Sequence, residues 1–187
     1  MKAILKEIIF RSPLNFLYLI LVVASSAVFA AAAEDAPSFA VWCWVCLYAI
    51  SVSDARQVKL ERSLPLRKET IADARYLLML VMLMIETALG AWQGVRSGSW
   101  GMQGMMIFSL WFSCGLWLMG ALGIGGKTVS WFSLGIFACM LLGVLFGRES
   151  CAPGIGVKGA LGLALAGFSS YMAFWLVSRR FMGKIDS

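Results

Sequence analysis

The chain has 187 residues, of which 60% are hydrophobic and only 14% are charged, with a net charge of +6 and no histidine. A soluble domain would carry roughly a quarter of charged residues, so the composition indicates a single membrane-embedded domain, residues 1–187. The lack of histidine removes the commonest general base and metal ligand, and no paired carboxylates or metal-ligand cluster appear, so neither an enzyme nor a metal site is expected.

The first twelve residues have the spacing of an amphipathic helix. Lys2, Lys6 and Arg11 share one side, and isoleucine and leucine side chains line the other. Such a segment lies in the plane of the membrane interface, so the sequence predicts an interfacial helix over residues 1–12. Pro13 then directs the chain into the bilayer.

Six apolar stretches follow. A helix needs about 20 apolar residues to cross a hydrocarbon core of ~30 Å. The predicted spans are roughly Leu14–Ala33, Phe39–Ser53, Tyr76–Gly94, Met105–Gly123, Val129–Gly147 and Gly159–Ser178. The connections are too short for a folded aqueous domain, so the predicted fold is an all-α polytopic membrane protein with six transmembrane helices.

Basic residues fix the expected orientation, because Lys and Arg collect on the cytoplasmic side of short loops. With both termini inside, thirteen bases face the cytoplasm and three face outward. The opposite orientation inverts this ratio. Membrane topology and the anionic lipid of the inner face therefore account for the positive charge, and no nucleic-acid partner is expected.

One long polar segment, Asp54–Arg75, separates the second and third spans and holds six of the sixteen bases. Ser63-Leu64-Pro65 interrupts it, and Leu66–Arg75 can form a short helix after the proline. Two interpretations stand side by side. The helix could insert into a groove of a soluble partner, or the segment could be a solvated loop held by lipid phosphates.

Glu86 is the only acidic residue well inside a predicted span. A carboxylate there costs ~2.5 kcal/mol or more unless it is protonated, paired or facing water. It is therefore either a substrate or proton site, or a neutral hydrogen-bonding group at a helix or subunit interface, with Thr87, Gln93 or Gln103 as candidate partners.

Gly120–Thr128, G-A-L-G-I-G-G-K-T, is close to a phosphate-binding loop but has Ala121 where the first glycine belongs. It follows an apolar span rather than a strand. We interpret it as a cytoplasmic turn and expect no nucleotide there.

The stretch Glu61–Leu77, E-R-S-L-P-L-R-K-E-T-I-A-D-A-R-Y-L, resembles the signature of small permease subunits of type 2 ATP-binding-cassette exporters. The matching positions are Ser63, Leu64, Pro65, Leu66, Ile71, Arg75, Tyr76 and Leu77. Two positions depart from the pattern: Arg67 replaces the usual capping Ser or Thr, and Thr70 stands where Glu is common. The six-span layout and the basic tail are also similar.

The resemblance implies a short cytoplasmic coupling helix, within a coupling loop over residues 54–75, that contacts a separate ATPase subunit. The implied coupling residues are Leu64, Pro65, Leu66, Arg67, Lys68, Glu69, Thr70 and Ile71. It also implies a second permease subunit, identical or not. ATP and magnesium would bind to the partner ATPase, and this chain would hold no cofactor.

The expected function is therefore that of a permease subunit in the bacterial inner membrane, exporting an amphipathic or hydrophobic substrate at the expense of ATP hydrolysed by its partner. Two other classes remain open. One is a small integral membrane receptor or immunity-type binding protein without transport, and the other is an ion-coupled transporter that uses Glu86.

Overall fold

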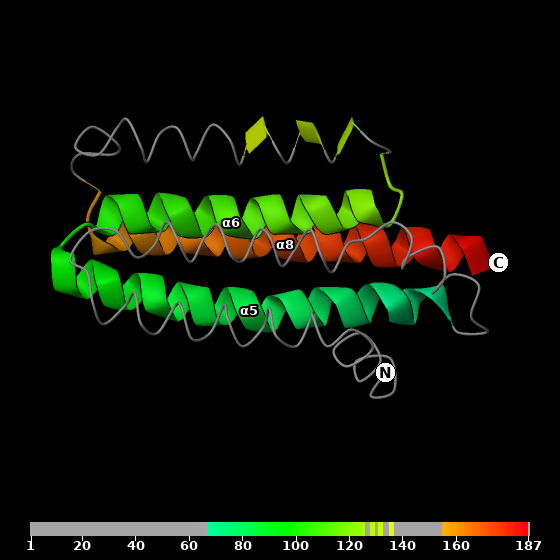
Figure 1. Ribbon diagram of the computed structural model, residues 1–187, viewed down its shortest axis with the longest axis horizontal. Helices are drawn as coiled ribbons and strands as arrows, with labels where there is room; N and C mark the ends of the chain where they lie inside the picture. The colour runs from blue at the N-terminus through cyan, green and yellow to red at the C-terminus, as the bar shows by residue number, and fades with distance from the viewer. Residues whose placement is uncertain (1–66, 126–127, 130, 133–134, 137–154, 187) are drawn as a thin grey trace, which may run out of the picture.

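The computed structural model of the chain describes residues 67–125, 128–129, 131–132, 135–136 and 155–186. All regular structure within these ranges is helical. The long helices are α5 (Lys68–Ser97), α6 (Trp100–Ala121) and α8 (Val157–Asp186), shown in Figure 1. The interfacial helix, the first two predicted spans and most of the fifth lie outside the described residues.

Each long helix is long and apolar enough to cross a membrane. They correspond to the third, fourth and sixth spans expected from the sequence, although α6 ends two residues before the predicted end of the fourth span. The described part of the chain is therefore all-helical, as predicted, with three helices that are long and apolar enough to span a membrane.

Helix α5 begins earlier than the predicted span. It runs without a break from Lys68, so residues 68–75 form its first two turns rather than a separate short helix. Its 30 residues span about 45 Å, more than the ~30 Å core requires. The expected boundary at Tyr76 is absent because no proline or glycine occurs between Lys68 and Leu89, and because Ile71 and Ala72 are already buried.

A tight turn joins α5 to α6. Gly98 adopts a left-handed conformation, with φ of 72°, and its N–H bonds to the carbonyl of Gly94 at 3.0 Å. This is the usual end of a helix at glycine. Only Gly98 and Ser99 separate the two helices, so they are antiparallel neighbours.

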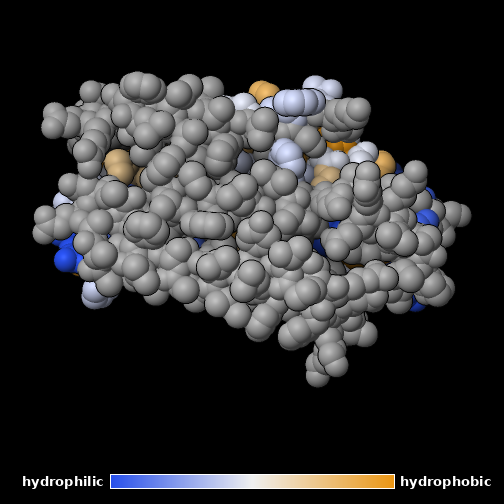
Figure 2. Space-filling model, in the orientation of Figure 1, coloured by the Kyte–Doolittle hydropathy of each residue, from blue (hydrophilic) through white to orange (hydrophobic). Residues whose placement is uncertain are grey.

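The start of α5 lies at the same end of the bundle as the carboxyl ends of α6 and α8 (Figure 1). Figure 2 shows strongly hydrophilic residues at both extremes of the long axis. Within the described residues, six bases lie at the end where α5 begins and two at the other. They are Arg67, Lys68, Arg75, Arg179, Arg180 and Lys184 against Arg96 and Lys158.

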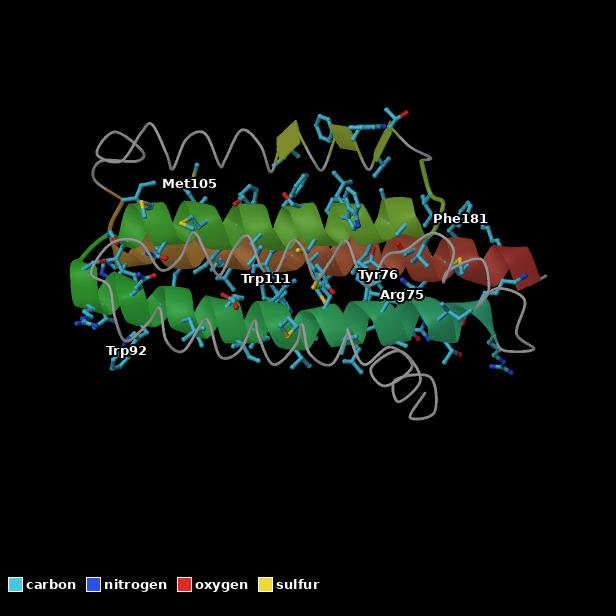
Figure 3. All side chains as sticks on the ribbon, in the orientation of Figure 1. Arg75, Tyr76, Trp92, Met105, Trp111 and Phe181 are labelled. Carbon is cyan, nitrogen blue, oxygen red and sulfur yellow. The ribbon has the colours of Figure 1, made fainter. Side chains whose placement is uncertain are left out.

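Aromatic residues hold the three helices together. Trp111 of α6 is 2% exposed and meets Phe168 and Tyr171 of α8 edge-on, each at a ring-centroid distance of 5.4 Å. Such edge-to-face pairs add to the stabilisation from burial. Figure 3 places Trp111 and Tyr76 in the space between α5 and the other two helices.

Candidate functional site

The amino-terminal end of α5 contains the described part of the predicted coupling segment. Leu64, Pro65 and Leu66 lie outside the described residues. Arg67 occupies the position before the helix and is exposed. Its side chain forms no capping hydrogen bond, whereas its carbonyl accepts the N–H of Thr70 at 2.9 Å. An arginine in place of a capping Ser or Thr therefore leaves the cap to the backbone.

The next four residues are more buried than Arg67. Lys68, Glu69 and Thr70 are half-buried, and Ile71 is only 1% exposed. The Glu69 carboxylate lies so close to Gly183 of α8 that a Cβ atom at position 183 would overlap it. Within residues 67–71, Arg67 is therefore the residue whose side chain is exposed.

One turn further along α5, Asp73 is bound by two side chains of α8. The Trp175 indole Nε1 donates to Asp73 Oδ1 at 2.8 Å, and Arg179 Nε lies 3.7 Å from Oδ2. Asp73 is 21% exposed and Arg179 51%, so water screens the ion pair. The indole hydrogen bond to a carboxylate is the stronger of the two contacts.

Deeper in the bundle, Tyr76 links all three helices. Its hydroxyl donates to the Gly115 carbonyl of α6 at 3.0 Å and lies 3.0 Å from Ser178 Oγ of α8. Because the single phenol proton goes to Gly115, the Ser178 hydroxyl donates to Tyr76. In return, Tyr171 donates to the main-chain carbonyl of Tyr76 at 2.6 Å.

We call this set of contacts the α5–α8 junction. It consists of Asp73 and Tyr76 of α5 and Tyr171, Trp175, Ser178 and Arg179 of α8. The Trp175 ring also stacks on Tyr76, with centroids 6.5 Å apart and planes inclined by 16°. The junction joins the start of α5 to the second half of α8.

Arg75 is fully buried, with 0% of its surface exposed. The sequence placed it with the bases of the aqueous loop, but the structure encloses it beside Tyr76 on α5 (Figure 3). A guanidinium keeps its proton in proteins, so its charge lies inside this end of the bundle.

Glu86 is 7% exposed and belongs to the buried side of α5. The structure gives the following hydrogen bonds for Thr87, Gln93 and Gln103, the partners that the sequence offered for Glu86. The Thr87 hydroxyl donates to the Leu83 carbonyl at 2.7 Å and accepts from Trp111 Nε1 at 2.8 Å. Gln103 Nε2 donates to Gln93 Oε1 at 3.4 Å. Polar groups thus line the α5–α6 interface from Glu86 toward the connecting turn.

In the described part of the chain, no group of three His, Cys, Asp or Glu side chains could hold a metal ion. Cys114, the cysteine within these ranges, is buried and outside any disulfide. The polar side chains of the described helices connect α5, α6 and α8 to one another.

Sequence reasoning missed the α5–α8 junction. Tyr171, Trp175 and Arg179 are spaced four residues apart and so share one face of a helix, which marks them as a possible unit. That spacing does not identify their partner. Asp73 seemed to belong to an aqueous loop, and it stands more than a hundred residues away in the sequence from Trp175.

Comparison with family models, curated proteins and solved structures finds no match to this chain.

Proposed function

We propose that this chain is the permease subunit of an ATP-binding-cassette exporter. The observation that carries the proposal is the position of Arg67 and the first turn of α5. They lie at the base-rich end of a bundle of membrane-length helices. They also belong to the sequence 61–77, which resembles the coupling signature of such permeases. A soluble ATPase could reach Arg67 there without entering the membrane.

In this proposal the partner subunit binds ATP and magnesium and hydrolyses the nucleotide. Two permease subunits, identical or different, would enclose the path of an amphipathic or hydrophobic substrate. Closure of the ATPase pair would push on residues 64–71, and the helix that begins there would carry the movement into the membrane.

The membrane would be the bacterial inner membrane, with the base-rich end in the cytoplasm. Six of the eight described bases at one end agree with the rule that Lys and Arg collect on the cytoplasmic side. The ATPase would then meet α5 on the side where ATP is available.

The direct test is affinity purification of the chain in mild detergent, with its partners identified by mass spectrometry. The proposal expects an ATPase subunit in stoichiometric amount. Recovery of the chain with no ATPase would instead favour a receptor or immunity-type binding protein.

The charge reversal Arg67→Glu tests the docking site itself. It should weaken ATPase binding without unfolding the bundle, because exposed substitutions usually change stability by less than about 0.5 kcal/mol, whereas like charges at an interface cost several. Lys158→Glu is the matched control, since it reverses an exposed base near the start of α8 at the opposite end. Equal ATPase binding by both variants would remove Arg67 from the docking surface.

A second candidate function is ion-coupled transport through Glu86. The observation in its favour is a buried acid on the same helix interface as the Gln93–Gln103 pair, which leads toward the α5–α6 turn. Ionisable groups inside membranes commonly mark proton or substrate paths. This candidate predicts transport driven by a proton gradient in the absence of ATP.

A further inference from the structure

We propose that the α5–α8 junction carries the ATPase-driven movement into the last span, α8, and that Asp73 and Trp175 are its positioning residues. This inference rests on the proposed function. In the sequence, the coupling segment connects the second and third predicted spans. Within the described residues, the first turns of α5 contact α8.

In the described part of the chain, three hydrogen bonds at this level join α5 to α8. Asp73 accepts from Trp175 at 2.8 Å, Ser178 lies 3.0 Å from the Tyr76 hydroxyl, and Tyr171 donates to the Tyr76 carbonyl at 2.6 Å. Helix α6 adds one further acceptor, the Gly115 carbonyl.

Close packing reinforces these bonds. Glu69 lies against Gly183, so the first turn of α5 rests directly on the backbone of α8 near its end. A force on Arg67 or Lys68 therefore meets α8 within two turns of its point of application. Tightly packed interfaces move as units between discrete arrangements rather than deforming continuously.

Each contact has a distinct part. The hydrogen bond from Trp175 fixes the Asp73 carboxylate, and the half-exposed Arg179 adds a screened attraction. Tyr76 is 1% exposed, and its hydroxyl joins the same two helices away from water. The start of α5 and the end of α8 should consequently move as one body.

The test uses the permease–ATPase complex in proteoliposomes, with native cysteines replaced. An environment-sensitive fluorophore on Lys158→Cys, at the far end of α8, reports movement when ATP and vanadate trap the ATPase pair. Trp175→Phe removes the donor to Asp73 but retains an aromatic ring. Trp92→Phe is the matched control, because Trp92 is 62% exposed on the outer side of α5 (Figure 3).

We expect Trp175→Phe to retain its ATPase partner and basal ATP hydrolysis. Its fluorescence response should fall roughly tenfold, because losing one hydrogen bond to a charged group changes an equilibrium constant by about that factor. Trp92→Phe should respond like the parent protein. Asp73→Asn should fall between them, because its amide oxygen still accepts from Trp175 whereas the charge that faces Arg179 is gone.

Rescue separates a positioning role from a merely structural one. A disulfide between Glu69→Cys and Gly183→Cys, closed before labelling, should restore the response of Trp175→Phe, because it joins the same two helices by a different bond. A Cβ at position 183 would lie 3.4 Å from Cγ of Glu69, so the two positions are near enough for this disulfide to be attempted.

A full response in Trp175→Phe, or a disulfide that abolishes the response of the parent protein, would overturn the inference while leaving the proposed function intact. If the wild-type chain co-purifies with no ATPase subunit, the proposed function is wrong, and the transport role of the junction is wrong with it.

Discussion

Tyr171 donates its hydroxyl proton to the main-chain carbonyl of Tyr76 at 2.6 Å, and the two rings meet edge-on with centroids 5.3 Å apart. Tyr171 lies in the middle of the last described helix, and Tyr76 lies near the start of the first. Both side chains are almost fully buried, at 0% and 1% exposure. The pair therefore joins the start of α5 to the middle of α8 at a site that excludes water.

Tyr76→Phe should destabilise the bundle more than Tyr171→Phe. The Tyr76 hydroxyl serves two partners, Gly115 and Ser178, whereas the Tyr171 hydroxyl serves one. Each lost hydrogen bond costs about 1 kcal/mol, so we expect roughly 2 against 1 kcal/mol. The measurement is unfolding in mixed detergent micelles with increasing denaturing detergent. Equal losses would show that Ser178 and Gly115 find other partners.

Arg75→Ala should be far more damaging than Arg67→Ala. Arg75 is fully buried and Arg67 is exposed, although both were expected in the aqueous segment. Truncating a buried charged side chain disrupts the groups packed around it and typically costs ~3–5 kcal/mol, while an exposed truncation stays within about 0.5 kcal/mol. Thermal aggregation of the two purified variants gives the comparison. Similar midpoints would contradict the enclosed position of Arg75.

Gly104 and Gly162 provide a matched pair for the α6–α8 contact. A Cβ at Gly104 would lie 2.7 Å from the Cα of Ala160, whereas one at Gly162 meets nothing within 4 Å. Gly104→Ala should therefore push the helices apart and destabilise the protein. Gly162→Ala should be neutral or stabilising by up to about 1 kcal/mol, because alanine favours a helix.

Detergent unfolding of both variants measures this difference. A destabilised Gly162→Ala protein would show that another chain or segment packs against that face. A stable Gly104→Ala protein would show that α6 and α8 can separate at little cost.

The sequence predicted the three described apolar helices well, because an unbroken run of about 20 apolar residues has few alternatives in a membrane. The cores of α5, α6 and α8 fall where hydropathy placed them. The start of α5 was predicted less well. Charged residues such as Lys68 and Asp73 suggested a helix separate from the span, but backbone continuity depends on helix breakers, and none occurs there.

The polar contacts between helices were harder still to predict from the sequence. The sequence offered Thr87, Gln93 and Gln103 as partners of Glu86. The structure joins Thr87 to Trp111 and Gln103 to Gln93, and these bonds depend on the rotation of α5 against α6. The pairing of Asp73 with Trp175 depends on the antiparallel course of α5 and α8. Composition and spacing along one chain do not encode such a crossing.

The orientation of the bundle can be tested by labelling thiols in intact cells. In a background without native cysteines, a membrane-impermeant reagent should reach Ser97→Cys at the α5–α6 end and should miss Lys184→Cys at the base-rich end. Both positions are exposed, so accessibility depends on the side of the membrane. The reverse pattern would place the base-rich end outside and remove the coupling role.

The last prediction concerns Glu86. Glu86→Gln should be tolerated better than Glu86→Lys, because the residue is 7% exposed and a neutral amide preserves hydrogen bonding inside the apolar bundle. Lysine introduces a charge whose burial in a membrane costs ~2.5 kcal/mol or more.

Assembly is measured by gel filtration in detergent, and transport is measured in proteoliposomes supplied either with ATP or with a proton gradient alone. Gln93→Leu serves as the control for loss of a polar group on the same interface, since it removes the acceptor of Gln103 without touching an ionisable group. If Glu86→Gln assembles normally but loses transport while Gln93→Leu retains it, the carboxyl proton itself is required. That outcome would favour the ion-coupled mechanism over ATP-driven export, because a helix-packing role needs only the hydrogen bond that glutamine retains.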